Sequence, residues 1–210
     1  MNVPLWKHKI SLEKDEEINM KIVLLGDSQR QPYCGYGKRV EEVLRKEGHE
    51  VFQPEDNSRF TKYLLRQLRD FRDEIKGADI IHFNAGHWDI GVMFKSDNEP
   101  FTSLDEYLAN LRRIVAEMKL ITPHIIFATT SPVKPHHADE TNELIEKYNA
   151  AAVKLMNELG VRVNDIYSVV LPRLDECVLG GKDQIHPTEI GKIVQSDQVL
   201  KVIHEEMKTF

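Results

Sequence analysis

Three residues near the two ends of the chain are of the types that nucleophilic acyl transfer requires. Ser28 ends the tripeptide Gly26-Asp27-Ser28, and Asp183 and His186 lie three positions apart, so one short loop can present both. A serine hydroxyl becomes a good nucleophile when a neutral imidazole takes its proton, and that imidazole needs a carboxylate on its other nitrogen. The sequence therefore supplies a serine, a histidine and an acid that could act together if the fold joins them.

The hydrophobic pattern predicts a fold that can join these residues. Five short apolar runs predict strands at 21–26, 50–54, 78–86, 124–130 and 161–165. Apolar residues at helical spacing predict helices at 37–48, 60–76, 104–119, 139–159 and 187–207. Strands that alternate with helices form crossover units, so the chain is predicted to be an α/β protein, a three-layer α/β/α sandwich around a parallel sheet of about five strands.

Two of the predicted helices carry recognisable start signals. Ser103 is followed three residues later by Glu106, the pattern of a capping box, and Pro187 stands at the favoured first turn of the closing helix.

Ligands of parallel sheets bind beyond the carboxyl ends of the strands. Ser28 follows the first strand and His186 directly precedes the closing helix, so both are expected at that edge. The backbone N–H of Ser28 could also face a developing oxyanion there.

Composition and charge exclude several classes of protein. The 210 residues include 28 Lys+Arg and 34 Asp+Glu, a formal net charge of −6 without any basic tract, and this argues against nucleic acid as the principal partner. No apolar stretch approaches the ~20 residues of a membrane-spanning helix, so no membrane partner is expected. The two cysteines form no CxxC pair. Residues 1–20 are a polar N-terminal arm or an upstream extension, without the apolar segment of a secretory signal. We therefore expect a cytoplasmic protein with one domain over 21–210.

The early Gly-Asp-Ser tripeptide and the late Asp-x-x-His pattern resemble the first and last blocks of the SGNH/GDSL hydrolase superfamily. The likeness extends from Lys21 to about His204. It implies a flavodoxin-like three-layer fold, a Ser/Asp/His triad and no required metal or cofactor. By this resemblance Ser28 is the nucleophile, His186 is the general base and acid, and Asp183 is the carboxylate that orients His186.

The middle blocks depart from the family pattern. The second block normally supplies a glycine whose N–H donates to the oxyanion, and here the segment 56–61 places Arg59 in that slot, beside Asn57. The third block is normally Gly-x-Asn-Asp but reads Gly-His-Trp-Asp, with Trp88 in place of asparagine. The expected oxyanion and substrate-binding residues are therefore Arg59, Asn57, Trp88 and Asn84, which lies two residues before the third block. Together with the later segments FATTSPV and ELIEKYN, this third block resembles a variant bacterial branch of the superfamily.

The favoured hypothesis is a cytoplasmic serine esterase that cleaves a small-molecule ester, including acyl groups carried on carbohydrate. Two other classes stay open. One is a weakly active or non-catalytic module that has kept the fold and binds a ligand such as a sugar, which the altered middle blocks would fit. The other is a flavodoxin-like nucleotide or flavin binder, which the lack of a glycine-rich phosphate loop disfavours.

Three further histidines have simpler interpretations. His82 alternates with apolar residues on a predicted strand and is expected in the core. His136 and His137 lie in a proline-flanked loop with Asp139 and are expected to be solvent-exposed rather than to bind a metal.

Overall fold

The protein is a five-stranded parallel sheet covered by helices on both faces. The computed structural model describes residues 19–210, so nearly all of the predicted N-terminal arm lies outside the described residues. The sheet has the order β2-β1-β3-β4-β5, and every neighbouring pair of strands is parallel. The strands are β1 (Lys21–Leu25), β2 (Glu50–Phe52), β3 (Ile80–Asn84), β4 (Ile125–Ala128) and β5 (Arg162–Asn164).

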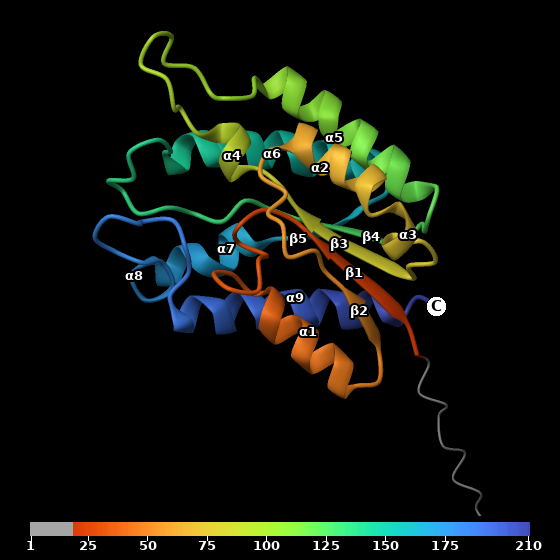
Figure 1. Ribbon diagram of the computed structural model, residues 1–210. Coiled ribbons are helices and arrows are strands. Elements are labelled where there is room, and N and C mark those ends of the chain that lie inside the picture. The colour runs from red at the N-terminus through yellow and green to blue at the C-terminus, as the bar shows by residue number, and fades with distance from the viewer. Residues whose placement is uncertain (1–18) are drawn as a thin grey trace, which may run out of the picture.

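Two helical layers enclose this sheet (Figure 1). One layer contains α2 (Thr61–Asp70), α3 (Arg72–Ile75), α4 (His87–Ile90), α5 (Leu104–Lys119) and α6 (Asn142–Glu158). The other contains α1 (Gly37–Lys46), α7 (Ile166–Val170), the 3-10 turn η1 (Leu171–Arg173), α8 (Leu174–Cys177) and α9 (Glu189–Met207). The predicted three-layer α/β/α sandwich is confirmed.

Alternation along the strands divides the core between the two layers. In β1, Val23 and Leu25 pack into the core under α2, α5 and α6, whereas Ile22 and Leu24 pack into the core under α1 and α9. Successive side chains of a strand point to opposite faces, and both faces of a parallel sheet are covered. This is why the strands read as unbroken apolar runs in the sequence.

The helix starts and breaks differ from the predictions at three places. The Ser103 cap is confirmed, because its Oγ accepts the Glu106 N–H at 3.3 Å, but the Glu106 side chain pairs with Lys62 instead of closing a capping box. The placement of Pro187 in the first turn of the last helix is wrong. That helix begins at Glu189, after a cap by Thr188, because Pro187 is held in a bridge with Val178.

The predicted helix over 60–76 is two helices, α2 and α3, which break at Phe71. The Phe71 backbone leaves the helical region, and its ring packs on Phe52 with the centroids 5.8 Å apart. The stretch after β5, where no helix was predicted, contains α7, η1 and α8. Between residues 19 and 210 there is no helix with the length and apolar character needed to cross a membrane.

Candidate active site

Ser28 lies in a tight turn directly after β1. The carbonyl of Asp27 accepts the N–H groups of Arg30 at 3.1 Å and Gln31 at 3.3 Å, and the Asp27 carboxylate accepts the N–H of Gln29 at 2.9 Å. Neither the hydroxyl nor the backbone N–H of Ser28 has a hydrogen-bond partner among residues 19–210. The hydrogen bonds of Asp27 thus hold the turn, and both groups of Ser28 are free.

Asp183 and His186 form a second tight turn, just before α9. One carboxylate oxygen of Asp183, Oδ1, accepts the N–H of Ile185 at 3.2 Å and that of His186 at 2.7 Å. Both carboxylate oxygens face His186 Nδ1, Oδ2 at 2.9 Å and Oδ1 at 3.1 Å. Burial alone would raise the pKa of Asp183, but the hydrogen bonds from the backbone and ring of His186 outweigh it and hold that pKa below its ordinary value. Asp183 is therefore ionised and fixes the Nδ1–H tautomer of His186.

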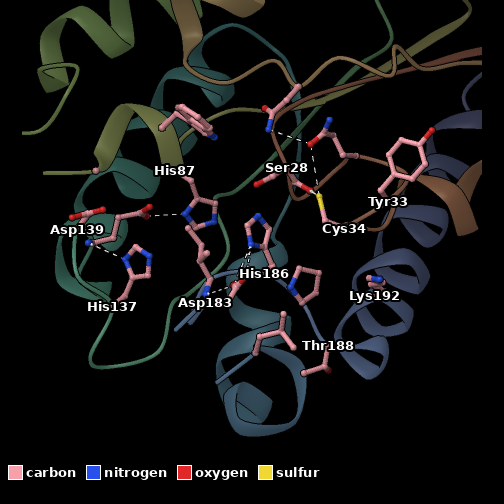
Figure 2. A pocket seen from close by; sticks show the side chains of 18 of the residues that line it. Ser28, Tyr33, Cys34, His87, His137, Asp139, Asp183, His186, Thr188 and Lys192 are labelled. Atoms are coloured by element: carbon pink, nitrogen blue, oxygen red, sulfur yellow. Dashed lines mark hydrogen bonds and ion pairs between the residues drawn. The ribbon is translucent and has the colours of Figure 1, made fainter. Parts of the chain in front are cut away.

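The two turns meet in one cavity of about 830 Å³, which Ser28, Asp183 and His186 all line. Figure 2 shows His186 next to Ser28, with Tyr33 and Cys34 on one side and His87, His137 and Asp139 on the other. Within the described chain His186 Nε2 has no hydrogen-bond partner, so it is free to accept a proton. The structure thus brings the three sequence-predicted residues together.

Gln29, which the sequence analysis did not single out, ties these two turns to each other. Its side-chain amide donates to the carbonyl of Ile185 at 3.1 Å across 156 positions of the chain. The side-chain oxygen of Gln29, Oε1, accepts the side-chain amide N–H of Gln195 on α9 at 3.4 Å. No local sequence signal marks this residue, because its partners come from distant segments.

Gly26 lets the chain leave β1 beside a buried side chain. A Cβ at this position would lie 1.9 Å from Asn84 Oδ1, and the φ angle of Gly26 is +153°. We expect Gly26→Ala to lower the free energy of unfolding by about 2–3 kcal/mol, because Asn84 must move in a packed interior. Urea unfolding measures this. Gly48→Ala is the matched control: φ is +91° but nothing lies within 4 Å of the new Cβ, so a larger loss there would contradict the packing explanation.

Asn84 supports the Ser28 turn through Asp27 and does not line the cavity. Its side-chain N–H donates to Asp27 Oδ1 at 2.7 Å, and its oxygen accepts the hydroxyl of Tyr36 at 3.0 Å. Asn84 is 4% exposed. Its amide thus supports the carboxylate that shapes the turn, and the residue lies outside the cavity lining, so it is not positioned as an oxyanion donor.

The second block places Asn57, and not Arg59, at the cavity. Arg59 has φ +47°, the left-handed region that glycine favours, which explains why the family has a glycine in this slot. Its N–H donates to Asn57 Oδ1 at 2.7 Å, and its guanidinium lies 4.6 Å from the ring centre of Tyr63. Asn57 lines the cavity, and its amide donates to Gln31 Oε1 at 3.2 Å.

The third block holds Trp88 at the cavity wall. Its neighbours His87, Asp89 and Ile90 in α4 are buried, whereas Trp88 is 37% exposed and lines the cavity. Asp89 accepts the N–H and the hydroxyl of Thr61 at 2.9 and 2.7 Å. Burial raises the pKa of Asp89 to about 6 against the effect of these hydrogen bonds. Asp89 thus joins the third block to the start of α2.

The remaining histidines differ in their surroundings. His82 is fully buried, with Nε2 3.1 Å from the amide of Asn164, and burial lowers its pKa to about 3, so it is a neutral core residue as predicted. His136 is exposed, but His137 is half-buried and accepts the N–H of Glu140 at 3.1 Å. Among residues 19–210 no group of three or more His, Cys, Asp or Glu side chains could hold a metal ion.

Comparison with known proteins finds a family match over most of the chain and similar plant proteins. Residues 24–192 match the GDSL-like lipase/acylhydrolase family. The chain is 28% identical over 119 residues to GDSL esterase/lipase CPRD49 of Arabidopsis thaliana, covering 50% of this chain and 46% of that protein. It is 24% identical over 162 residues to GDSL esterase/lipase WDL1 of Oryza sativa subsp. japonica, covering 71% and 62%. The chain thus spans less than two thirds of either relative.

A solved structure shares the fold at low sequence identity. Axe2, an acetylxylan esterase from Geobacillus stearothermophilus, superposes with a TM-score of 0.68 at 20% identity, over 87% of this chain and 93% of that chain. Solved catalytic mutants of Axe2 replace a serine, and an aspartate and a histidine three positions apart, by alanine.

Proposed function

Because the chain belongs to the GDSL-like lipase/acylhydrolase family, a family of carboxylic ester hydrolases, we propose that it hydrolyses carboxylic esters through Ser28, His186 and Asp183. The observation that carries this proposal is the state of His186. Its Nδ1 is bound by Asp183 at 2.9 Å, while its Nε2 is free in the cavity that also holds the free hydroxyl of Ser28. A general base for a serine nucleophile needs a fixed tautomer and a second ring nitrogen that is free, and His186 has both.

The proposed reaction has two halves that use the same base. Ser28 Oγ bonds to the ester carbonyl carbon while its proton passes to His186 Nε2, and the carbonyl oxygen becomes an oxyanion. Collapse of this intermediate breaks the bond to the alcohol, which leaves with the proton from Nε2. A water molecule then attacks the acyl-enzyme, gives its proton to Nε2, and the acid leaves as the proton returns to Ser28. Asp183 keeps the Nδ1–H in place throughout.

The residues at the cavity suggest three oxyanion donors. The backbone N–H of Ser28 has no acceptor among the described residues, and the side-chain N–H groups of Asn57 and Trp88 belong to residues that line the cavity. Arg59 and Asn84 are left out, because neither residue lines the cavity.

Trp88→Phe tests the indole donor. Phenylalanine keeps an aromatic wall but removes the N–H, and loss of one oxyanion donor typically costs a factor of about 10²–10³ in kcat. We expect kcat for p-nitrophenyl acetate to fall by about 10²-fold, with KM and the midpoint of thermal unfolding nearly unchanged. A variant with the kcat of the wild type would show that Trp88 is only a wall of the cavity.

The size and lining of the cavity favour a small ester or an ester on a sugar. Tyr33 is 75% exposed and lines the cavity on the side of Ser28 away from His87 (Figure 2). Its ring offers a flat apolar face with a polar tip, which suits a ring that carries hydroxyl groups. Axe2, which shares the fold, is an acetylxylan esterase. Comparing kcat/KM for acetylated xylo-oligosaccharides and p-nitrophenyl butyrate tests this substrate class.

Labelling with a fluorophosphonate tests the esterase proposal itself. The reagent reacts covalently with an activated serine, so peptide mapping should place the label on Ser28. A second candidate, a binding module that has kept the fold, is favoured by one observation: two of the donors expected from the sequence, the Arg59 N–H and the Asn84 amide, are committed to other groups. Absence of both labelling and ester hydrolysis would support that second candidate.

A further inference from the structure

A second line of hydroxyl, imidazole and carboxylate groups is buried at the wall of the cavity, which His87 and Glu140 line. His87 Nδ1 lies 2.7 Å from Glu140 Oε2, and His87 Nε2 lies 3.0 Å from Ser131 Oγ. All three residues are buried, with Ser131 2%, His87 3% and Glu140 6% exposed. Figure 2 shows the dashed contact at His87, on the cavity side opposite Tyr33.

This line is not a second nucleophilic triad. Ser131 is buried and is not part of the cavity lining, so no substrate reaches its hydroxyl. Both ring nitrogens of His87 are occupied, so the ring has no nitrogen free to accept a proton from a substrate or water. Burial alone would lower the pKa of His87, but the charge and hydrogen bond of Glu140 outweigh it and hold that pKa above its ordinary value.

The three residues join segments that carry the active-site groups. His87 opens α4 and immediately precedes Trp88. Glu140 lies in the segment 134–141 between β4 and α6, and the N–H of Lys134 in that segment donates to the carbonyl of Gln184 at 2.9 Å. Gln184 lies between Asp183 and His186 in the left-handed region, at φ +60°.

We propose that His87, Glu140 and Ser131, which we call the His87 clamp, are positioning residues that hold α4 and the segment 134–141 together. The clamp thereby fixes Trp88 on one side of the cavity relative to the turn of Asp183 and His186 on the other. This inference rests on the proposed esterase function. A misplacement of about 1 Å between reacting groups and donors can cost 10²-fold in rate, so such a clamp acts on kcat.

Two substitutions of Glu140 separate positioning from charge. Glu140→Ala removes the acceptor of His87 Nδ1, and we expect kcat for p-nitrophenyl acetate to fall by about 10- to 100-fold with a smaller change in KM. Glu140→Gln keeps an oxygen that accepts the Nδ1 proton, and we expect it to restore most of kcat. Wild-type kcat in Glu140→Ala would overturn the proposal, and so would a Gln variant as slow as the Ala variant.

Glu206→Ala is the matched control for general destabilisation. Glu206, 8% exposed, holds His124 Nδ1 at 2.8 Å and also pairs with Arg162, at the end of the sheet opposite the cavity. We expect this variant to unfold at a lower temperature with kcat unchanged. An equal loss of kcat in Glu206→Ala and Glu140→Ala would mean that the His87 clamp stabilises the fold and does not position the site.

A fluorescence measurement tests the clamp without relying on activity. The chain has two tryptophans, so Trp6→Phe leaves Trp88 as the only one. In this background we expect Glu140→Ala to increase acrylamide quenching of Trp88, and Glu206→Ala to leave it unchanged. Unaltered quenching in Glu140→Ala would overturn the proposal. A wild-type protein that neither hydrolyses esters nor labels at Ser28 would instead refute the esterase function, and the quenching result would still decide whether the clamp holds Trp88.

Discussion

Replacing Ser28 by alanine will lower kcat for p-nitrophenyl acetate by about 10⁵–10⁶-fold, to little more than the rate that binding and the oxyanion donors give alone. The reason is that no acyl-enzyme can form without the hydroxyl. Steady-state hydrolysis and fluorophosphonate labelling measure the loss, and both should disappear together.

The stability of Ser28→Ala separates this effect from unfolding. The Ser28 hydroxyl makes no hydrogen bond within residues 19–210, and the turn around it is held by Asp27. We therefore expect the free energy of unfolding to change by less than about 0.5 kcal/mol. Ser168→Ala, at an exposed position on α7, is the control substitution of the same type. If Ser28→Ala kept wild-type activity, the proposed nucleophile would be wrong.

Asp183→Asn should lower kcat by about 10⁴-fold while leaving the turn before α9 in place. The two backbone N–H groups of Ile185 and His186 both donate to Oδ1 of Asp183, so an amide oxygen in that position can still accept them. The amide NH₂ would then occupy the position of Oδ2, 2.9 Å from His186 Nδ1. Oδ1 lies farther from Nδ1, at 3.1 Å, so we expect the nearer NH₂ group to make Nδ1 an acceptor. The ring proton then moves to Nε2, which can no longer take the proton of Ser28.

Asp183→Ala distinguishes the tautomer effect from loss of the turn. It removes the acceptor of both backbone N–H groups as well as the partner of the ring, so we expect a loss of kcat together with a loss of about 1 kcal/mol of stability. Asp183→Asn should lose kcat with a thermal midpoint close to that of the wild type. Activity of the Asn variant within tenfold of the wild type would show that Asp183 does not set the tautomer of His186.

Much of the fold can be read from the sequence because its signals are local and repeated. All five predicted strands and most predicted helices are present, and helix α5 has the predicted limits 104–119. The errors came where tertiary contacts overrode a local signal. Phe71 breaks the helix over 60–76 where it packs on Phe52, and the bridge of Pro187 to Val178 delays the start of the last helix.

The candidate serine, aspartate and histidine could be predicted from the sequence, but the oxyanion donors around them could not. Ser28 and the pair of Asp183 and His186 stand at the ends of a parallel α/β unit, where general rules place ligands. The donors around them were not predictable, since Asn57 and Asn84 carry the same amide and only one lines the cavity. The amide of Asn84 donates instead to the carboxylate of Asp27, 57 positions away in the chain.

The three-layer fold, the edge of the sheet where a site is expected, and the candidate serine, histidine and acid can all be read from the sequence. These features follow from hydrophobic periodicity and from short motifs, which act within a few residues. Which side chains face the cavity, and how its two sides are joined, depends on the tertiary structure. The contact of His87 with Glu140 spans 53 positions and that of Gln29 with Ile185 spans 156. Such contacts depend on how separate loops pack, and no local pattern in either loop specifies the partner in the other.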